Sequence, residues 1–96
     1  MQAFAGEAIT VADTAIGFTA ATFQPATAPG AASGAFITVE TAQIRFRFDG
    51  TDPSATVGHI AEIGDVIKLN SAQDCVYFRA IRTGATSAVI HCTYLR

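Results

Sequence analysis

Hydrophobic and polar residues alternate along most of this chain with a period of two. In EAITVA the alternation places Ile9 and Val11 on one face, and in AFITVET it places Ile37 and Val39 on one face. Neighbouring side chains of a strand point to opposite faces, so this pattern is typical of strands with one buried side. No segment shows sustained helical spacing between helix start and stop signals. The pattern therefore predicts β-strands.

Further strand-like segments follow the same rule. AIGFT is expected to form a hairpin with EAITVA about a turn at Asp13-Thr14. Turn signals at Gly64-Asp65 and at residues 83–86 separate the later segments, and NSAQD is expected to be a loop. The remaining predicted strands are QIRFRFD, TVGHIAEI, DVIKLN, CVYFRAIR and SAVIHCTYLR. About seven to eight short strands at this spacing predict an all-β fold, a single-domain antiparallel β-sandwich or small barrel.

The segment QIRFRFD reverses the parity of the strand before it. Its apolar positions are Ile44, Phe46 and Phe48, which predicts that these side chains face the core. A period of two cannot change parity without an extra residue, so a bulge or bend is expected near Ala42-Gln43.

A chain of 96 residues has the length of one domain, and we expect a single domain over residues 1–96. Within it, QPATAPGAASG (residues 24–34) holds two of the three prolines and is predicted to be a loop. Its flanks are too short to be separate domains.

The composition is apolar and poor in charge. Half of the residues are hydrophobic and only 15% are charged, with a net charge of −2. Phosphate-backbone binding needs clustered Lys and Arg in excess, so a nucleic-acid partner is not expected. The chain contains no long apolar run that would cross a membrane and no secretory signal pattern, so a membrane partner is not expected either. A small domain with so few charges is a candidate for covering part of its surface with other subunits.

Cysteine and histidine give no catalytic or metal pattern. Cys75 and Cys92 lie in apolar segments and are expected to be buried free thiols, although a disulfide between them stays open. No third ligand stands at a recognisable spacing from His59 and His91. On a strand, His91 and Cys92 point to opposite faces, so they do not form a nucleophile–base pair. We therefore expect no enzyme activity, no metal and no cofactor.

The turn DGTDP is acidic, but its pattern does not fit a cation site. Asp49, Gly50, Asp52 and Pro53 lack the repeated oxygen ligands and the distal Glu of a calcium loop. Asp side chains bond to nearby backbone in turns and Gly supplies positive φ, so these four residues are predicted to shape the turn.

Four arginines are the remaining candidates for a site: Arg45, Arg47, Arg79 and Arg82. They either lie in solvent as partners of Glu40 or aspartates, or they form the polar part of a subunit contact, where arginine is enriched. The sequence leaves both interpretations open.

Three stretches of this chain resemble a family of short phage and prophage virion-associated proteins. They are FITVETAQIRFRFDGTDPSATVGH, GDVIKL and FRAIRTGATSAVIHCTY, and VADTAIGFTAATFQP is similar to the opening segment of that family. The resemblance covers about two-thirds of the chain, roughly residues 35–95. The chain departs from it at Cys92, where the family pattern has Val.

The resemblance implies a small β-sandwich that is encoded among capsid, connector and tail genes. It implies a non-enzymatic virion structural or assembly protein, made in the host cytoplasm and carried in the virion, with capsid or other virion proteins as partners. Capsid decoration and stabilisation by a homo-oligomer, a trimer included, is the favoured role. A carbohydrate- or peptide-binding β-sandwich module is the alternative, but tryptophan is absent and most phenylalanines are predicted to be buried.

Overall fold

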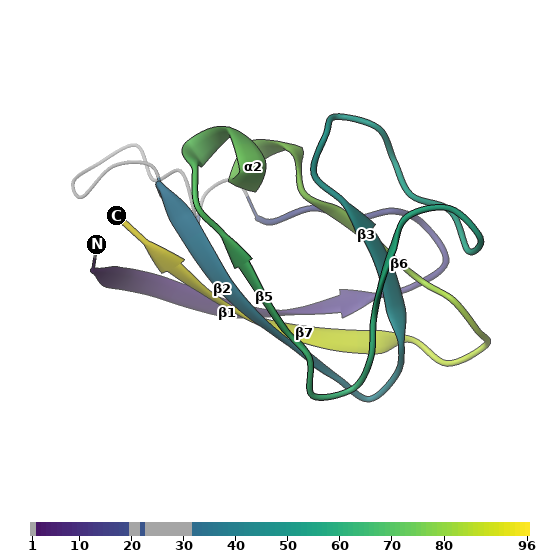
Figure 1. Cartoon of the computed structure of the whole chain (residues 1–96). Helices are drawn as coiled ribbons and strands as arrows, with labels where there is room; N and C mark the ends of the chain where they lie inside the picture. The colour runs from purple at the N-terminus through teal and green to yellow at the C-terminus, as the bar shows by residue number, and fades with distance from the viewer. Residues whose placement is uncertain (1, 20–21, 23–31) are drawn as a thin grey trace.

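Antiparallel strands make up most of the computed structural model, which describes residues 2–19, 22 and 32–96 (Figure 1). The elements of this described part follow in the order β1 (Ala3–Val11), β2 (Gly34–Glu40), β3 (Ile44–Arg47), β4 (His59–Ala61), β5 (Val66–Leu69), α2 (Ala72–Tyr77), β6 (Arg79–Arg82) and β7 (Ala88–Leu95).

The strands form two sheets that pack against each other. The four-stranded sheet has the order β1-β7-β2-β5, and the three-stranded sheet has the order β4-β3-β6. Every strand pair within the described residues is antiparallel. The predicted all-β fold with antiparallel sandwich architecture is therefore confirmed.

The chain changes sheet between β2 and β3. Thr41 takes a positive φ of 76°, which is rare for a β-branched residue, and Ala42 N donates to the Glu40 carbonyl (2.9 Å). The resulting bend carries the chain from the four-stranded to the three-stranded sheet (Figure 1). The bend lies where the parity change predicted one, and the change of sheet explains it, since the core then lies on the other side of the strand.

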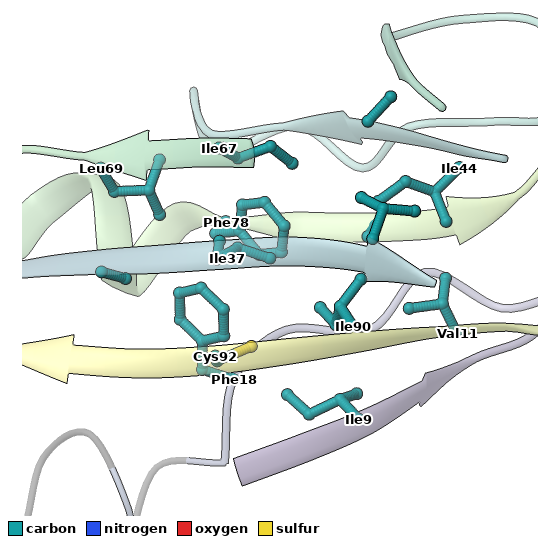
Figure 2. Packing of buried hydrophobic residues seen from close by; sticks show 14 of the residues in the cluster. Ile9, Val11, Phe18, Ile37, Ile44, Ile67, Leu69, Phe78, Ile90 and Cys92 are labelled. Atoms are coloured by element: carbon teal, nitrogen blue, oxygen red, sulfur yellow. The ribbon is translucent and has the colours of Figure 1, made fainter. Parts of the chain in front are cut away.

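The inner faces of the two sheets enclose one core. Figure 2 shows Ile37, Ile90 and Cys92 of the four-stranded sheet pointing toward Phe78 and Phe18, which fill the space between the layers. The Phe18 and Phe78 rings stack with centroids 4.7 Å apart, and the buried Tyr94 ring meets Phe18 edge-on at 5.1 Å. The alternation in β7 holds in full, because its residues 88, 90, 92 and 94 are buried. Cys75 and Cys92 are free and buried, as expected.

One predicted strand is wrong in its first half, because residues 72–77 form α2 instead. Ser71 caps this helix, with its hydroxyl accepting a hydrogen bond from Asp74 N (3.1 Å). The helix turns Cys75 into the core and ends at Tyr77. The extended backbone of its C-cap, Phe78 (φ −60°, ψ 130°), leads into β6. The loop expected over NSAQD is thus the start of a helix.

The predicted hairpin between residues 7–12 and 15–19 is also wrong. The partner of β1 is β7, from Ala3 opposite Leu95 to Val11 opposite Ala88. The chain after β1 instead crosses to the three-stranded sheet. There, Ile16 exchanges backbone hydrogen bonds of 2.9 Å with Ala80.

The crossing covers the β6 edge of the three-stranded sheet and leaves the edges of β4 and β5 open. The outer edge of β6 is occupied by the chain before Phe18, through Ile16 and through the bond from Arg82 N to the Ala12 carbonyl (3.0 Å). Within the described residues, β1, β4 and β5 have no strand on their outer edges. Of these, β4 and β5 follow each other along the chain and are joined by the turn predicted at Gly64-Asp65.

The loop expected over residues 24–34 falls on residues 24–31 outside the described part, and Gly34 begins β2. Residues 83–86 do form a turn, but it joins β6 and β7 of different sheets, so it is not a hairpin. Among the described residues, no helix has the length and hydrophobicity needed to cross a membrane.

Candidate functional site

Three of the four candidate arginines lie on one face. Arg45 stands opposite Ile60 and Ile81, and Arg47 stands opposite Arg79. Paired residues of neighbouring strands share a face, and Ile44 on the same strand as Arg45 and Arg47 is fully buried, so these arginines occupy the outer face of the three-stranded sheet. Arg82 pairs with Ile44 and therefore belongs to the other face.

Each of these arginines has a partner within the chain. Arg45 donates from Nε to the Ala55 carbonyl (3.1 Å) and from Nη1 to the Gly58 carbonyl (2.8 Å), so it braces the loop before β4. Arg79 donates from Nη1 to the carbonyls of Val76 (3.0 Å) and Phe78 (2.7 Å) at the end of α2. Arg82 donates to Ser87 Oγ (3.2 Å). The guanidinium groups of these three arginines bind loop and helix-end groups of their own chain. Their role in a subunit contact stays a prediction.

The turn after β3 is held by Asp49. Its Oδ1 accepts from Thr51 N (3.2 Å), and Gly50 has a φ of 89°, which favours glycine. Arg47 binds the same carboxylate through Nε to Oδ1 (3.2 Å) and Nη2 to Oδ2 (2.5 Å). The hydrogen bond from the Arg47 guanidinium lowers the pKa of the Asp49 carboxyl. Pro53 is buried behind the turn, while Asp52 is exposed.

A pocket of about 330 Å³ opens beside this turn, at the end of the three-stranded sheet. We call it the Phe48 pocket, and its lining comes from two segments, Arg47-Phe48-Asp49 after β3 and Val57-Gly58-His59 before and at the start of β4. Its volume is at the lower end of the range for small-ligand sites, roughly 300–1,000 Å³.

Aromatic rings connect the Phe48 pocket to the core. The Phe46 ring lies 6.3 Å from Phe48, 5.4 Å from His59 and 5.9 Å from Phe78, measured between centroids. Phe48 itself is 37% exposed, which contradicts its predicted core position. The sheet ends at Arg47, so the ring that follows it is only partly covered, by Phe46 and His59.

A second pocket, of about 230 Å³, lies on the other side of the turn. Gly50 and Asp52 line it together with Val76, Tyr77 and Arg79 from the α2–β6 region. Because α2 was not predicted, sequence reasoning could not bring Tyr77 near the turn. The serine cap at position 71 followed three residues later by Asp74 was the available signal.

The histidines and cysteines do not meet. His91 is on the outer face of the four-stranded sheet, with Nε2 2.6 Å from the Glu40 carboxylate, and His59 is at the Phe48 pocket. Burial raises the pKa of the Cys75 thiol to about 11 and that of Cys92 to about 12, so both remain protonated and unreactive near neutral pH. Among the described residues, no group of three or more His, Cys, Asp or Glu side chains is placed to bind a metal ion.

Large aliphatic side chains are exposed along the open side of the sandwich. Ile60 on β4 is 50% exposed, Ile63 in the following turn is 63% exposed, and Val66 at the start of β5 is 50% exposed. We call these three residues the open-side aliphatics. Ile60 stands opposite Arg45 and faces outward from the three-stranded sheet, whereas Val66 stands opposite Thr38 and faces outward from the four-stranded sheet. Ile63 lies in the turn between these two edge strands.

Comparison of the chain with models of protein families, with curated proteins and with solved structures finds no match. Any functional assignment therefore depends on the residues described above and on the sequence stretches that contain them.

Proposed function

We propose that this chain is a non-enzymatic structural protein of a phage particle, and that it decorates or stabilises the capsid through subunit contacts. The observation that carries the proposal is the pair of open strand edges, β4 and β5, flanked by the open-side aliphatics. Unpaired edges and exposed apolar side chains on a monomer favour association with another chain.

The residues at the edges of β4 and β5 favour assembly with another chain over a monomeric state. Ile63 and Val66 flank Gly64 and Asp65, and the nearest strand, β4, contributes only three residues. Soluble proteins usually protect an edge with lysines, prolines or a covering loop, yet Lys68 is the only lysine here and its Nζ lies over the Phe36 ring, 5.9 Å from the centroid. A partner that adds a strand or an apolar surface would cover both edges at once.

The sequence supports the same proposal independently. The stretch that resembles phage virion-associated proteins contains β2, β3 and the Asp49 turn, and its closing part contains β6 and β7. The proposal extends that resemblance to a place in the virion, with capsid or other virion proteins as the partners.

The direct test is co-sedimentation of the purified chain with capsids of the phage that encodes it. Ile63→Glu should weaken capsid binding at least tenfold, because it places a charge among the open-side aliphatics. Ile16→Glu is the matched control, since Ile16 is also exposed (39%) but lies on the covered side of the sandwich, and it should bind like the unmodified chain. A chain that is strictly monomeric by light scattering and does not bind capsids would refute the proposal.

A further inference from the structure

The Phe48 pocket has walls that are fixed before any ligand arrives. Gly58 adopts a φ of 132°, and its carbonyl accepts the 2.8 Å hydrogen bond from Arg45 Nη1. A Cβ at Gly58 would lie 3.2 Å from the Phe46 carbonyl oxygen and from Pro53 Cβ, so the loop already packs closely against β3. Such a preformed pocket loses little conformational entropy when it binds.

The apolar part of the pocket is an exposed ring with a fixed position. Phe48 packs against Phe46, and Phe46 in turn stacks near Phe78 in the core. The His59 ring lies 6.1 Å from the Phe48 ring, and Val57 beside them is 51% exposed. The ring face of Phe48 therefore offers an apolar platform that does not need to be rearranged.

The polar part of the pocket carries no net charge. Arg47 and Asp49 neutralise each other through their two hydrogen bonds, of 3.2 and 2.5 Å. The pair nevertheless offers guanidinium donors and carboxylate acceptors side by side, because a carboxylate accepts about four hydrogen bonds and a guanidinium donates five. Within the described residues, the His59 side chain has no hydrogen bond, so its ring nitrogens are also free for a ligand.

These features select for a ligand that has an apolar face and a hydroxylated edge but no charge. A charged ligand would meet a pair that is already neutralised, and a purely apolar ligand would leave the donors and acceptors of Arg47 and Asp49 without partners. A sugar ring matches both requirements, because its C–H face can lie on an aromatic ring while each hydroxyl both donates and accepts. We propose that the Phe48 pocket is a binding site for a neutral saccharide. It lies at the loop end of the three-stranded sheet and is distinct from the open-side aliphatics.

The test is ligand-observed and protein-observed NMR on the whole chain with a panel of neutral sugars: glucose, galactose, mannose, N-acetylglucosamine, maltose and lactose. At least one sugar should receive saturation at its ring C–H protons and should shift the resonances of His59. Phe48→Ala should weaken that binding at least tenfold, and Asp49→Asn should weaken it several-fold by removing the paired carboxylate.

Phe36→Ala is the matched control, because Phe36 is exposed to nearly the same degree (39%, against 37% for Phe48) but lies on the outer face of the four-stranded sheet. It should leave sugar binding unchanged. Thermal unfolding of each variant separates a lost site from a lost fold. The proposal is overturned if no sugar of the panel binds with a Kd below 10 mM, if Phe36→Ala weakens binding as much as Phe48→Ala, or if nucleosides or short peptides bind in place of the sugars. Capsid binding by Ile63→Glu is measured on a separate surface, so the two proposals fail independently.

Discussion

Phe78 lies where the two sheets and the helix α2 meet, so its truncation to alanine is the most informative test of the fold. The side chain is fully buried, stacks on Phe18 with centroids 4.7 Å apart, and lies 5.9 Å from the Phe46 ring of β3. It is also the C-cap of α2 and directly precedes β6. Phe78→Ala removes a ring that contacts both layers and leaves its neighbours facing a cavity.

The expected cost follows from this burial. Truncation of a buried phenylalanine to alanine destabilises proteins by about 3–5 kcal/mol, through lost transfer free energy and the cavity. A domain of 96 residues has a total free energy of unfolding of roughly 5–14 kcal/mol. The substitution should therefore remove about a fifth of the stability or more, and it should lower Tm by at least about 12 °C.

Urea denaturation followed by circular dichroism measures this difference, with Phe36→Ala as the control. Phe36 contacts Lys68 on the outer face of the four-stranded sheet, and its truncation should cost less than about 1 kcal/mol. If Phe78→Ala costs no more than Phe36→Ala, then Phe78 does not fill the space between the sheets and the packing described here is wrong.

Three further outcomes are expected. Gly58→Ala should destabilise the chain by about 1–3 kcal/mol in the same urea assay, because its φ of 132° is open almost only to glycine and a Cβ would press on neighbouring atoms at 3.2 Å. Arg45→Ala should cost about 1–3 kcal/mol, since it removes the charged donor to two carbonyls of the loop before β4. The free energy of unfolding should fall as pH rises above about 9, because burial raises the thiol pKa to about 11 at Cys75 and about 12 at Cys92, so the unfolded chain releases protons that the folded chain keeps. Each thiol contributes a slope of about 1.4 kcal/mol per pH unit in that range.

Matched variants test the reason for each outcome. Gly84→Ala, in open space, should change stability by less than about 1 kcal/mol, and Arg47→Ala, whose partner Asp49 is exposed, should also cost less than about 1 kcal/mol. The double variant Cys75→Ala, Cys92→Val should lose most of the fall between about pH 8.5 and 9.5, whereas a fall near and above pH 10 should remain, because burial also raises the pKa of the Tyr94 hydroxyl. An equally steep fall in that variant would show that other groups cause it.

The alternation of hydrophobic residues was sufficient to predict the layers. In β2 and β7 it identified Ile37, Val39 and the buried face of the last strand, because these strands have one side on the core and one in solvent. The parity change before Ile44 also located the bend, although a single sequence does not distinguish a bulge from a change of sheet.

The partners of the strands were not predictable in the same way. Residues 7–12 were expected to pair with the nearest strand-like segment, yet β1 pairs with the most distant one, β7. The alternation of residues within a strand predicts which side is buried. It does not predict which other strand forms the backbone hydrogen bonds with it. Similarly, the apolar run through Cys75 was consistent with a strand or a buried helix turn, and only the Ser71 cap separates the two.

The Phe48 pocket was partly visible in the sequence. The stretch from Asp49 to Pro53 was predicted to be a turn, and Asp49 lines the Phe48 pocket while Gly50 and Asp52 line the second pocket. What was missed is the exposure of Phe48, because the periodic pattern continues one position beyond the end of β3. The approach of Val57 and His59 depends on the brace from Arg45 to Gly58, which joins residues 13 positions apart.

The pairing of β1 with β7 also determines when the protein can fold on the ribosome. β1 has no other strand partner in the described chain, and β7 inserts between β1 and β2 as an inner strand of its sheet. At ordinary translation rates, roughly 4–15 s pass between synthesis of Val11 and synthesis of Ala88. During that interval the apolar residues of β1 wait without a partner, so a nascent chain of this protein should bind chaperones until its last strand emerges, and a chain released before β7 should remain unfolded.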